Sequence, residues 1–199
     1  MRYDKGRKEA SRRLIMEVAT KRFREDGIAA SGIASIMSDA GLTNGAFYAH
    51  FESKEELVRE CVSTTQIDQS KLLQEALDTG SLELLIAAYL SPEHRDAPGQ
   101  GCISAALLGE LSRQSSETRK RYTEGLLNLM CLMATALPKG GSDVEDVMLA
   151  IFSTLIGSLQ LARAVEGAGL SDRILGAGVD AAGAILQSHQ NNKTGGTKI

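Results

Sequence analysis

Between Gly41 and Leu57 the sequence reads GLTNGAFYAHFESKEEL and gathers polar, aromatic and basic side chains into one short stretch. Asn44 carries an amide, which can pair with an adenine edge in bidentate fashion, and the hydroxyl of Thr43 can reach a phosphate or a base. Gly45 allows the backbone to approach a ligand closely. These groups are suited to hydrogen bonding along the major groove of a nucleic acid.

The same stretch contains three of the eight aromatic residues of the chain, namely Phe47, Tyr48 and Phe51. Phe47 and Phe51 are four residues apart and share a helix face, so we expect both to be buried against a preceding helix. Tyr48 and His50 lie on the other faces, where a hydroxyl and an imidazole can donate to phosphate oxygens. Lys54 falls in the first turn of the next helix, beside N–H groups that favour an anion. A compact apolar helix with incidental polar residues is the alternative interpretation.

The surrounding residues predict a helix-turn-helix. The first helix is expected to bury a stripe of apolar residues and to end at Gly27. Arg22 lies within this stripe. Arg22 must therefore extend outward or meet a phosphate or a carboxylate. A second helix is capped by Ser31 and ends at Gly41. A third helix of about two turns is capped by Thr43, which completes the helix-turn-helix. Ser53 and Glu56 form a capping box that marks the start of the next helix. The inward residues are Leu14, Ile15, Val18, Ala19 and Phe23 in the first helix and Ile33, Ile36 and Met37 in the second.

The rest of the chain also has helical periodicity, which predicts an all-α protein. Expected helices cover 57–78, 81–90, 102–113, 116–137, 142–165 and 171–187, with a proline-containing break over 91–101 and a second capping box at Ser142 and Glu145. The polar end, SHQNNKTGGTKI, is expected to be disordered. The predicted domains are an N-terminal three-helix domain over 1–56, a larger helical domain over 57–188 and a tail over 189–199.

The charge distribution favours a polyanionic partner for the N-terminal end. Residues 1–24 hold nine Lys or Arg and three acids, a local charge of 9 − 3 = +6, whereas the whole chain carries −3. Such an end is typical of nucleic-acid binding, and a solvated basic arm is the alternative.

The segment IAASGIASIMSDAGLTNGAFYAHFESKEELV resembles the DNA-binding domain of the tetracycline-repressor (TetR) family, in the order and spacing of its AG, aromatic-Tyr, HF and SKE elements. Gly32, Asn44 and Ala49 depart from the residues usual in that family. The resemblance implies a transcriptional regulator bound to a double-stranded DNA operator. The DNA contacts that it implies are Ser31, Thr43, Asn44, Gly45, Tyr48, His50 and Lys54.

The resemblance further implies that the larger domain binds a small-molecule effector and forms a homodimer through the last two helices. The helix from Ser142 has an apolar face too wide for one neighbour, and Gly176, Gly178 and Gly183 suggest close approach of a second subunit. A repressor released by an apolar or weakly polar effector is therefore expected. The residues expected to line the effector pocket are Tyr89, Cys102, Leu107, Leu111, Tyr122, Met130, Met133 and Phe152.

Other classes of function receive little support from the sequence. The three histidines are far apart and no catalytic or phosphate-binding motif is present, so we expect no enzyme, no cofactor and no metal site. Without a long apolar run or an N-terminal signal segment, no membrane partner is expected and the cytoplasm is the predicted location. Two alternatives stay open: a redox- or metal-responsive regulator of the same fold that uses Cys102 and His94, and a helical dimer that binds proteins instead of DNA.

Overall fold

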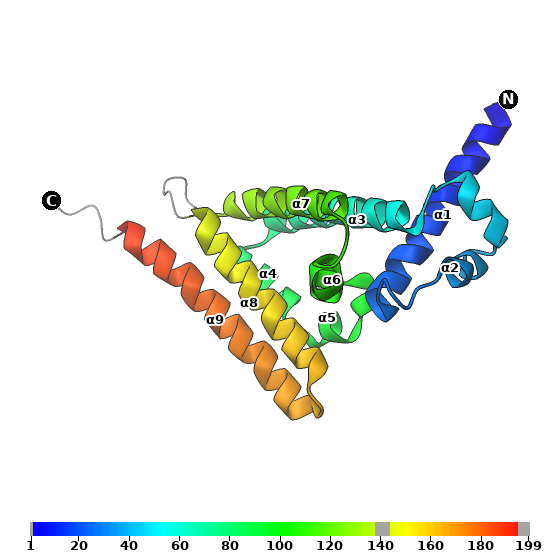
Figure 1. Ribbon diagram of the computed structural model, residues 1–199. Helices are drawn as coiled ribbons and strands as arrows, with labels where there is room; N and C mark the ends of the chain where they lie inside the picture. The colour runs from blue at the N-terminus through cyan, green and yellow to red at the C-terminus, as the bar shows by residue number, and fades with distance from the viewer. Residues whose placement is uncertain (1, 138–143, 195–199) are drawn as a thin grey trace. The chain divides into compact units, whose positions relative to one another are not determined.

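The structure is a computed structural model that describes residues 2–137 and 144–194, and within those ranges it contains helices and no strand (Figure 1). This arrangement confirms the all-α prediction. The elements are α1 (Arg2–Asp26), α2 (Ile33–Asp39), η1 (Asn44–Ala49), α3 (Lys54–Thr79), α4 (Leu82–Tyr89), α5 (Pro92–Asp96), η2 (Pro98–Gln100), α6 (Ile103–Leu111), α7 (Ser116–Ala134), α8 (Val144–Ala164) and α9 (Ala168–Thr194).

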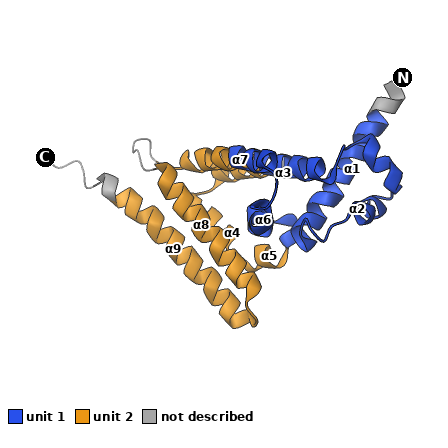
Figure 2. Ribbon diagram, in the orientation of Figure 1, with its two compact units in different colours: residues 1–68, 98–125 blue, residues 69–97, 126–199 orange. Residues whose placement is uncertain are grey.

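The chain divides into two compact units, shown in separate colours in Figure 2. Unit 1 comprises residues 1–68 and 98–125, and unit 2 comprises residues 69–97 and 126–199. The boundary predicted between residues 56 and 57 falls inside α3. Unit 1 is larger than the predicted domain because Leu57, Val58 and the α6 residue Leu107 share one hydrophobic core with α1.

The core of unit 1 supports the short helices of the helix-turn-helix. Ile15, Ala19 and Phe23 of α1 are buried with Phe47 and Phe51, which confirms the inward side of α1 and the structural role of both phenylalanines. Leu14, by contrast, is 41% exposed, so the buried stripe of α1 is narrower than predicted. Phe47 and Phe51 stack with their ring centroids 5.5 Å apart.

Glycines end both helices that precede η1. Gly27 and Gly41 have φ values of +89° and +65°, the left-handed conformation in which glycine is favoured, and they confirm the predicted helix ends. The predicted N-cap of α2 is wrong, however. Gly32 occupies the N-cap position, and the hydroxyl of Ser31 donates instead to the carbonyl oxygen of Gly27 at 2.7 Å.

The segment after Gly41 is a 3-10 helix, η1, with Thr43 at its N-cap position and no hydrogen bond from the Thr43 side chain to the helix. The next helix begins as predicted, because the Glu56 N–H donates to the hydroxyl of Ser53 at 3.1 Å. The carboxylate of Glu56 accepts from the backbone N–H of Glu52 at 2.6 Å, one residue before the position that a capping box requires.

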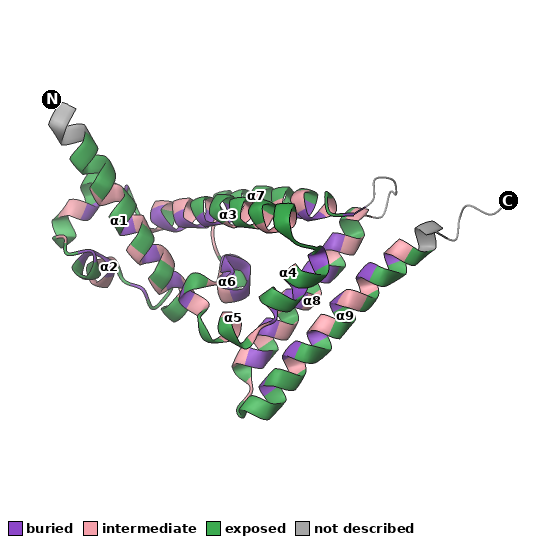
Figure 3. Ribbon diagram, turned by 180° about the vertical axis from the view of Figure 1, so that it is seen from behind, coloured by how far each residue is buried: buried purple, intermediate pink, exposed green. Residues whose placement is uncertain are grey.

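In unit 2, α8 and α9 run side by side as a hairpin whose buried and exposed positions alternate (Figure 3). Gly178 permits this approach, because a Cβ atom there would lie 2.4 Å from the Ser158 Oγ and 2.8 Å from the Leu90 Cδ1. Gly178 thus makes a close contact within the chain, whereas the prediction concerned a contact with a second copy. By length and composition α8 could cross a membrane, but Met148, Ile151, Phe152 and other apolar residues of α8 are buried in the fold.

Three predicted element boundaries need correction. The break over 91–101 contains α5 and η2, and Ser91 caps α5 by accepting from the His94 N–H at 3.2 Å. Helix α9 begins at Ala168, before the predicted Ser171, and continues to Thr194, so residues 189–194 are helical and not part of a disordered tail. The remaining tail residues, 195–199, and the Ser142 side of the second capping box lie outside the described residues.

Candidate nucleic-acid interface

The polar residues around η1 form an exposed surface that the buried phenylalanines support. Thr43, Asn44 and Gly45 are exposed, and Tyr48 is 68% exposed although its ring packs edge-on against Phe47 at 5.2 Å. Phe47 itself is fully buried. Because one face of η1 is fixed in the core, the opposite face presents a hydroxyl, an amide and a phenol to solvent. These groups can donate to and accept from a DNA groove and its phosphates.

His50 lies at the edge of this surface, beside the basic part of α1. Its side chain is half-buried, and its Nδ1 atom is buried without a hydrogen-bond partner in the structure. Partial burial lowers the pKa of His50, and the nearby charges of Lys8 and Arg12 lower this pKa further. Lys8 and Arg12 thus lie near His50, so the basic N-terminal part of α1 and the η1 surface can contact the same polyanion.

Arginines of α1 hold the helix-turn-helix together. The guanidinium of Arg12 pairs with Glu60 at 2.5 Å and lies 4.4 Å above the centroid of the Phe51 ring. Arg22 pairs with Asp39 at 2.5 Å and with Asp26 at 3.3 Å, which confirms the carboxylate partner predicted for this residue. These contacts join α1 to α3 and to α2, so both arginines have structural roles.

Two residues of the expected contact set have other roles in the structure. Ser31 has no exposed surface and its hydroxyl bonds to Gly27, so the expectation that Ser31 contacts DNA is not supported by its position. Lys54 donates from Nζ to the carbonyl oxygen of Ile28 at 2.5 Å. Partial burial lowers the pKa of Lys54, while the carboxylate of Glu110 opposes that shift.

Glu110 is the residue near this surface that the sequence did not indicate. Its carboxylate accepts hydrogen bonds from the backbone N–H groups of Ile28 at 3.0 Å and Ala29 at 2.8 Å. Since Glu110 lies on α6, far along the chain from residues 28 and 29, no local spacing could have revealed the contact.

The residues expected to line an effector pocket are divided between the two units. Cys102, Leu107 and Leu111 are buried in unit 1, and the Tyr122 hydroxyl donates to the Ser104 Oγ at 2.9 Å. The members in unit 2 are Tyr89, Met130, Met133 and Phe152, of which all but Tyr89 are buried. Tyr89 packs edge-on against His94 with 4.6 Å between ring centroids. Leu107 and Leu111 belong to the hydrophobic core that supports the helix-turn-helix.

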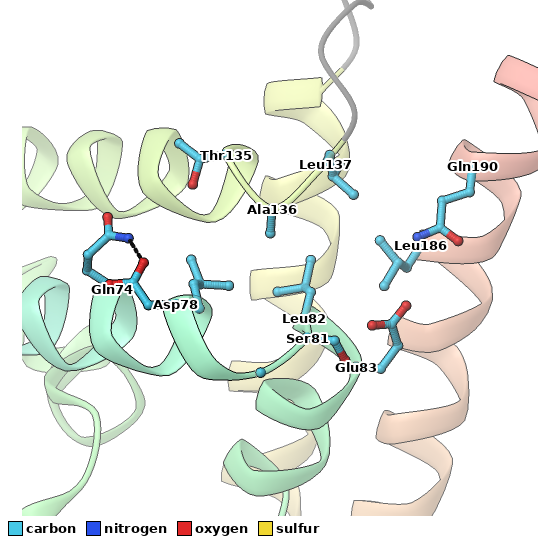
Figure 4. Close-up of a pocket in the computed structure, with 12 residues that line it drawn as sticks. Gln74, Asp78, Ser81, Leu82, Glu83, Thr135, Ala136, Leu137, Leu186 and Gln190 are labelled. Atoms are coloured by element: carbon cyan, nitrogen blue, oxygen red, sulfur yellow. Dashed lines mark hydrogen bonds between the residues drawn. The ribbon is translucent and has the colours of Figure 1, made fainter.

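Unit 2 contains a cavity of about 370 Å³ that none of those eight residues lines (Figure 4). Its polar lining comes from Gln74 and Asp78 of α3, Glu83 of α4, Thr135 and Gln190. Gln74 donates to Asp78 at 2.8 Å. The pKa of Glu83 is lowered by its own backbone N–H, by Ser81 and by Gln190. The acidic groups of the cavity are therefore already paired within the protein.

The cysteines, all in the described part of the chain, form no disulfide. Cys61 is buried, and burial raises its pKa to about 12, so its thiol is unreactive at neutral pH. Cys102 is also buried, whereas Cys131 is exposed. Among the described residues, no group of three or more His, Cys, Asp or Glu side chains is placed to hold a metal ion.

Sequence comparisons identify the N-terminal domain. Residues 15–61 match the family model described as "Bacterial regulatory proteins, tetR family". The chain is 34% identical over 95 residues to the HTH-type transcriptional repressor KstR2 of Mycolicibacterium smegmatis, a match that covers 44% of this chain and 46% of KstR2. It is 28% identical over 110 residues to the repressor DhaR of a Mycobacterium species, covering 54% and 56% of the two chains. The chain thus spans about half the length of the curated relatives it matches.

A structural comparison covers more of the chain and concerns the fold. A crystal structure of a TetR-family transcriptional regulator from Agrobacterium tumefaciens matches with a TM-score of 0.72 at 18% identity. The match covers 87% of this chain and 97% of that protein. Residues 15–61 therefore form a helix-turn-helix domain of the tetR family of bacterial regulatory proteins, and the chain as a whole shares the fold of that solved regulator.

Proposed function

We propose that this protein is a homodimeric transcriptional repressor that binds a pseudo-palindromic DNA operator and is released by a small-molecule effector. The main support is the exposed set of Thr43, Asn44, Gly45 and Tyr48 on a 3-10 helix anchored by Phe47, within a domain that matches the tetR family. The repressor names of the relatives agree with the direction of regulation. Such a protein acts on DNA in the cytoplasm and requires no cofactor.

The contacts divide into those that read bases and those that bind the backbone. Asn44 reads a base edge, since its amide can pair with adenine, and Thr43 and Gly45 allow η1 to enter the major groove closely. Tyr48 and His50 bind phosphate oxygens and set the register of the domain on the duplex. Exposed Arg7, Lys8 and Arg13 add positive charge along α1, and Lys8 lies near His50.

Two copies associate through α8 and α9 in this proposal. On α8 the exposed residues Ala150, Ser153, Gly157, Leu161 and Ala164 recur every three or four positions and form one face. Leu161 on α8 is 59% exposed, and Leu170 on α9 is 48% exposed. The space beside Gly176 of α9 is open, because a Cβ atom added there would have no neighbour within 4 Å. Small residues with a few leucines permit close packing of the helix pair from a second copy. The two η1 helices would then meet successive major grooves, roughly 34 Å apart.

The effector is proposed to be apolar or weakly polar, and within unit 2 it is proposed to contact Tyr89, Met130, Met133 and Phe152. The effector is proposed to bind a conformation of the dimer that cannot contact both half-sites of the operator. Such an effector lowers the affinity for DNA, and DNA lowers the affinity for the effector by the same factor. The alternative of a redox- or metal-responsive regulator through Cys102 has less support, because Cys102 is only 7% exposed and reactive thiols are usually accessible. Retention of the effector response in Cys102→Ser would exclude that alternative.

The experiment that tests the proposal is selection of bound fragments from random double-stranded DNA, followed by a screen for compounds that release them. Recovery of a two-fold symmetric sequence supports a dimer on DNA, and release by a compound of apolar character supports the effector class. Binding that does not weaken with salt would favour a protein partner instead, since contacts to phosphate release counterions.

A further inference from the structure

We propose that Glu110 is a positioning residue for DNA binding, which holds the turn before the helix-turn-helix from the side of α6, and that Lys54 acts with it. The turn in question is residues 27–31, which join α1 to α2 and are named here the α1–α2 turn. This inference rests on the proposed function, because its consequence is a loss of operator affinity. All the residues concerned lie in unit 1.

The contact is made by both oxygens of one carboxylate. Oε1 of Glu110 accepts from the N–H of Ile28 at 3.0 Å, and Oε2 accepts from the N–H of Ala29 at 2.8 Å. Hydrogen bonds to an ionised acceptor are stronger than those between neutral groups. The side chain therefore ties two consecutive backbone groups of the α1–α2 turn to α6.

Glycine at position 27 makes this approach possible. A Cβ atom on Gly27 would lie 2.5 Å from Oε1 of Glu110, and the φ of +89° is one that other residues rarely adopt. The positive φ favours glycine, and a Cβ atom at this position would displace the Glu110 carboxylate. The turn and the carboxylate are thus matched to each other in shape.

Lys54 completes the arrangement from α3. Its Nζ donates to the carbonyl oxygen of Ile28 at 2.5 Å, so the same residue is held through its N–H by an anion and through its C=O by a cation. The charge of Glu110 also favours the protonated form of Lys54 against the cost of its partial burial. The two side chains act on one peptide segment from two different helices.

The α1–α2 turn leads directly to the elements that would meet DNA. After the turn come α2, with Ile36 and Met37 in the shared core, and η1 with Phe47 in the same core. A displaced turn must move these packed residues or leave them strained, and small misplacements of binding groups weaken recognition strongly. Glu110 therefore affects DNA affinity without contacting DNA.

The proposal gives Lys54 a role different from the phosphate contact that the family resemblance implies. Loss of a phosphate contact reduces the dependence of log affinity on log salt concentration by about 0.9 for each contact. Loss of a positioning contact lowers affinity and leaves that dependence unchanged. The salt dependence of Lys54→Ala therefore separates the two roles.

The test uses the full chain and a duplex recovered by selection, with Glu110→Gln as the principal variant. Glu124→Gln is the matched control: it makes the same charge change in unit 1, and Glu124 pairs only at the surface, with Arg121 at 3.3 Å. Removal of a negative charge should by itself favour DNA binding slightly, so a loss in Glu110→Gln cannot be electrostatic in origin. Amide hydrogen exchange at Ile28 and Ala29 provides a readout that needs no DNA.

We expect Glu110→Gln to weaken operator binding by about ten-fold with unchanged salt dependence, and to speed amide exchange at Ile28 and Ala29. Lys54→Ala should also leave the salt dependence unchanged, and the double variant should lose less than the product of the two single losses. Gly27→Ala, which displaces the carboxylate by another route, should reproduce the loss. Glu124→Gln should stay within about two-fold of the original affinity.

Normal affinity and normal amide exchange in folded Glu110→Gln would overturn the proposal while leaving DNA binding intact. A reduced salt dependence in Lys54→Ala would return Lys54 to the phosphate contacts and overturn its part. Failure of the unsubstituted chain to bind any duplex is a different result, which would count against the proposed function.

Discussion

At the scale of single residues, Asn44 is the side chain expected to carry sequence preference. Its amide is exposed at the start of η1, where a recognition helix meets base edges. Asn44→Ala should change the preferred base at one position of each half-site and cost about 1–3 kcal/mol on the original operator. Repeating the selection with this variant measures the change, and recovery of the unaltered sequence would show that Asn44 does not read a base.

Tyr48 is expected to behave differently, because a phosphate contact carries no sequence information. Tyr48→Phe keeps the ring, which packs against Phe47, and removes only the exposed hydroxyl. Affinity should fall by a similar factor, about 0.5–1.5 kcal/mol, on operators of different sequence. Fluorescence anisotropy on two unrelated bound duplexes tests this, and a loss confined to one of them would assign Tyr48 to base recognition.

The sequence predicted the exposed residues of the site better than the residues that hold them. Phe47 and Phe51 were placed correctly, since a four-residue spacing fixes a shared face. The role of Ser31 was predicted wrongly, because a serine just before a helix is usually its N-cap. In the structure the Ser31 hydroxyl donates to the carbonyl oxygen of Gly27 instead. Glu110 and the partner of Lys54 were missed, since contacts between distant segments leave no periodic signal.

At the scale of elements, the α8–α9 hairpin depends on Gly178. Gly178→Ala places a methyl group 2.4 Å from the Ser158 Oγ and 2.8 Å from the Leu90 Cδ1, so the helices must separate or Ser158 must move. The free energy of unfolding should fall by about 1–3 kcal/mol. Gly109→Ala is the control, because Gly109 is helical and exposed, and a methyl group added there would have no neighbouring atom within 4 Å.

Urea unfolding of both variants measures the difference. Gly109→Ala should be neutral or more stable by up to about 1 kcal/mol, through its helix propensity alone. Equal stability of Gly178→Ala and Gly109→Ala would mean that α8 and α9 are not packed as closely as the structure shows.

The periodicity of apolar residues predicted which segments are helical. The ends of the helices were predicted correctly where a glycine or a serine marks them. Gly27, Gly41 and Ser53 gave correct ends. The C-terminal end of α9 was placed too early because its polar residues have the composition of a tail, although His189 is buried in the fold at 5% exposure. The helices α5 and η2 were missed because two prolines were taken to exclude helix, whereas Pro92 and Pro98 each begin one.

At the scale of the whole molecule, the proposed dimer depends on the exposed face of α8. Leu161→Glu places a charge in the centre of that face, and two such charges would meet across a symmetric interface. The variant should remain folded and sediment as a single subunit at concentrations where the original chain is a dimer. Leu84→Glu is the control, since Leu84 is 65% exposed on α4 and lies outside α8 and α9.

Operator affinity should follow the loss of the dimer. A single helix-turn-helix makes half of the contacts, so Leu161→Glu should bind the full operator much more weakly and should show a smaller salt dependence. Wild-type affinity in a monomeric variant would show that the two recognition helices do not act together.

The binding of two copies to one operator is tested most directly by the mass of the complex between the full chain and a selected operator duplex, determined by sedimentation at low and at raised ionic strength. We expect two protein chains for each duplex and dissociation of the complex as the salt concentration increases. One chain for each duplex, or no complex at low ionic strength with any selected or random duplex, would contradict it.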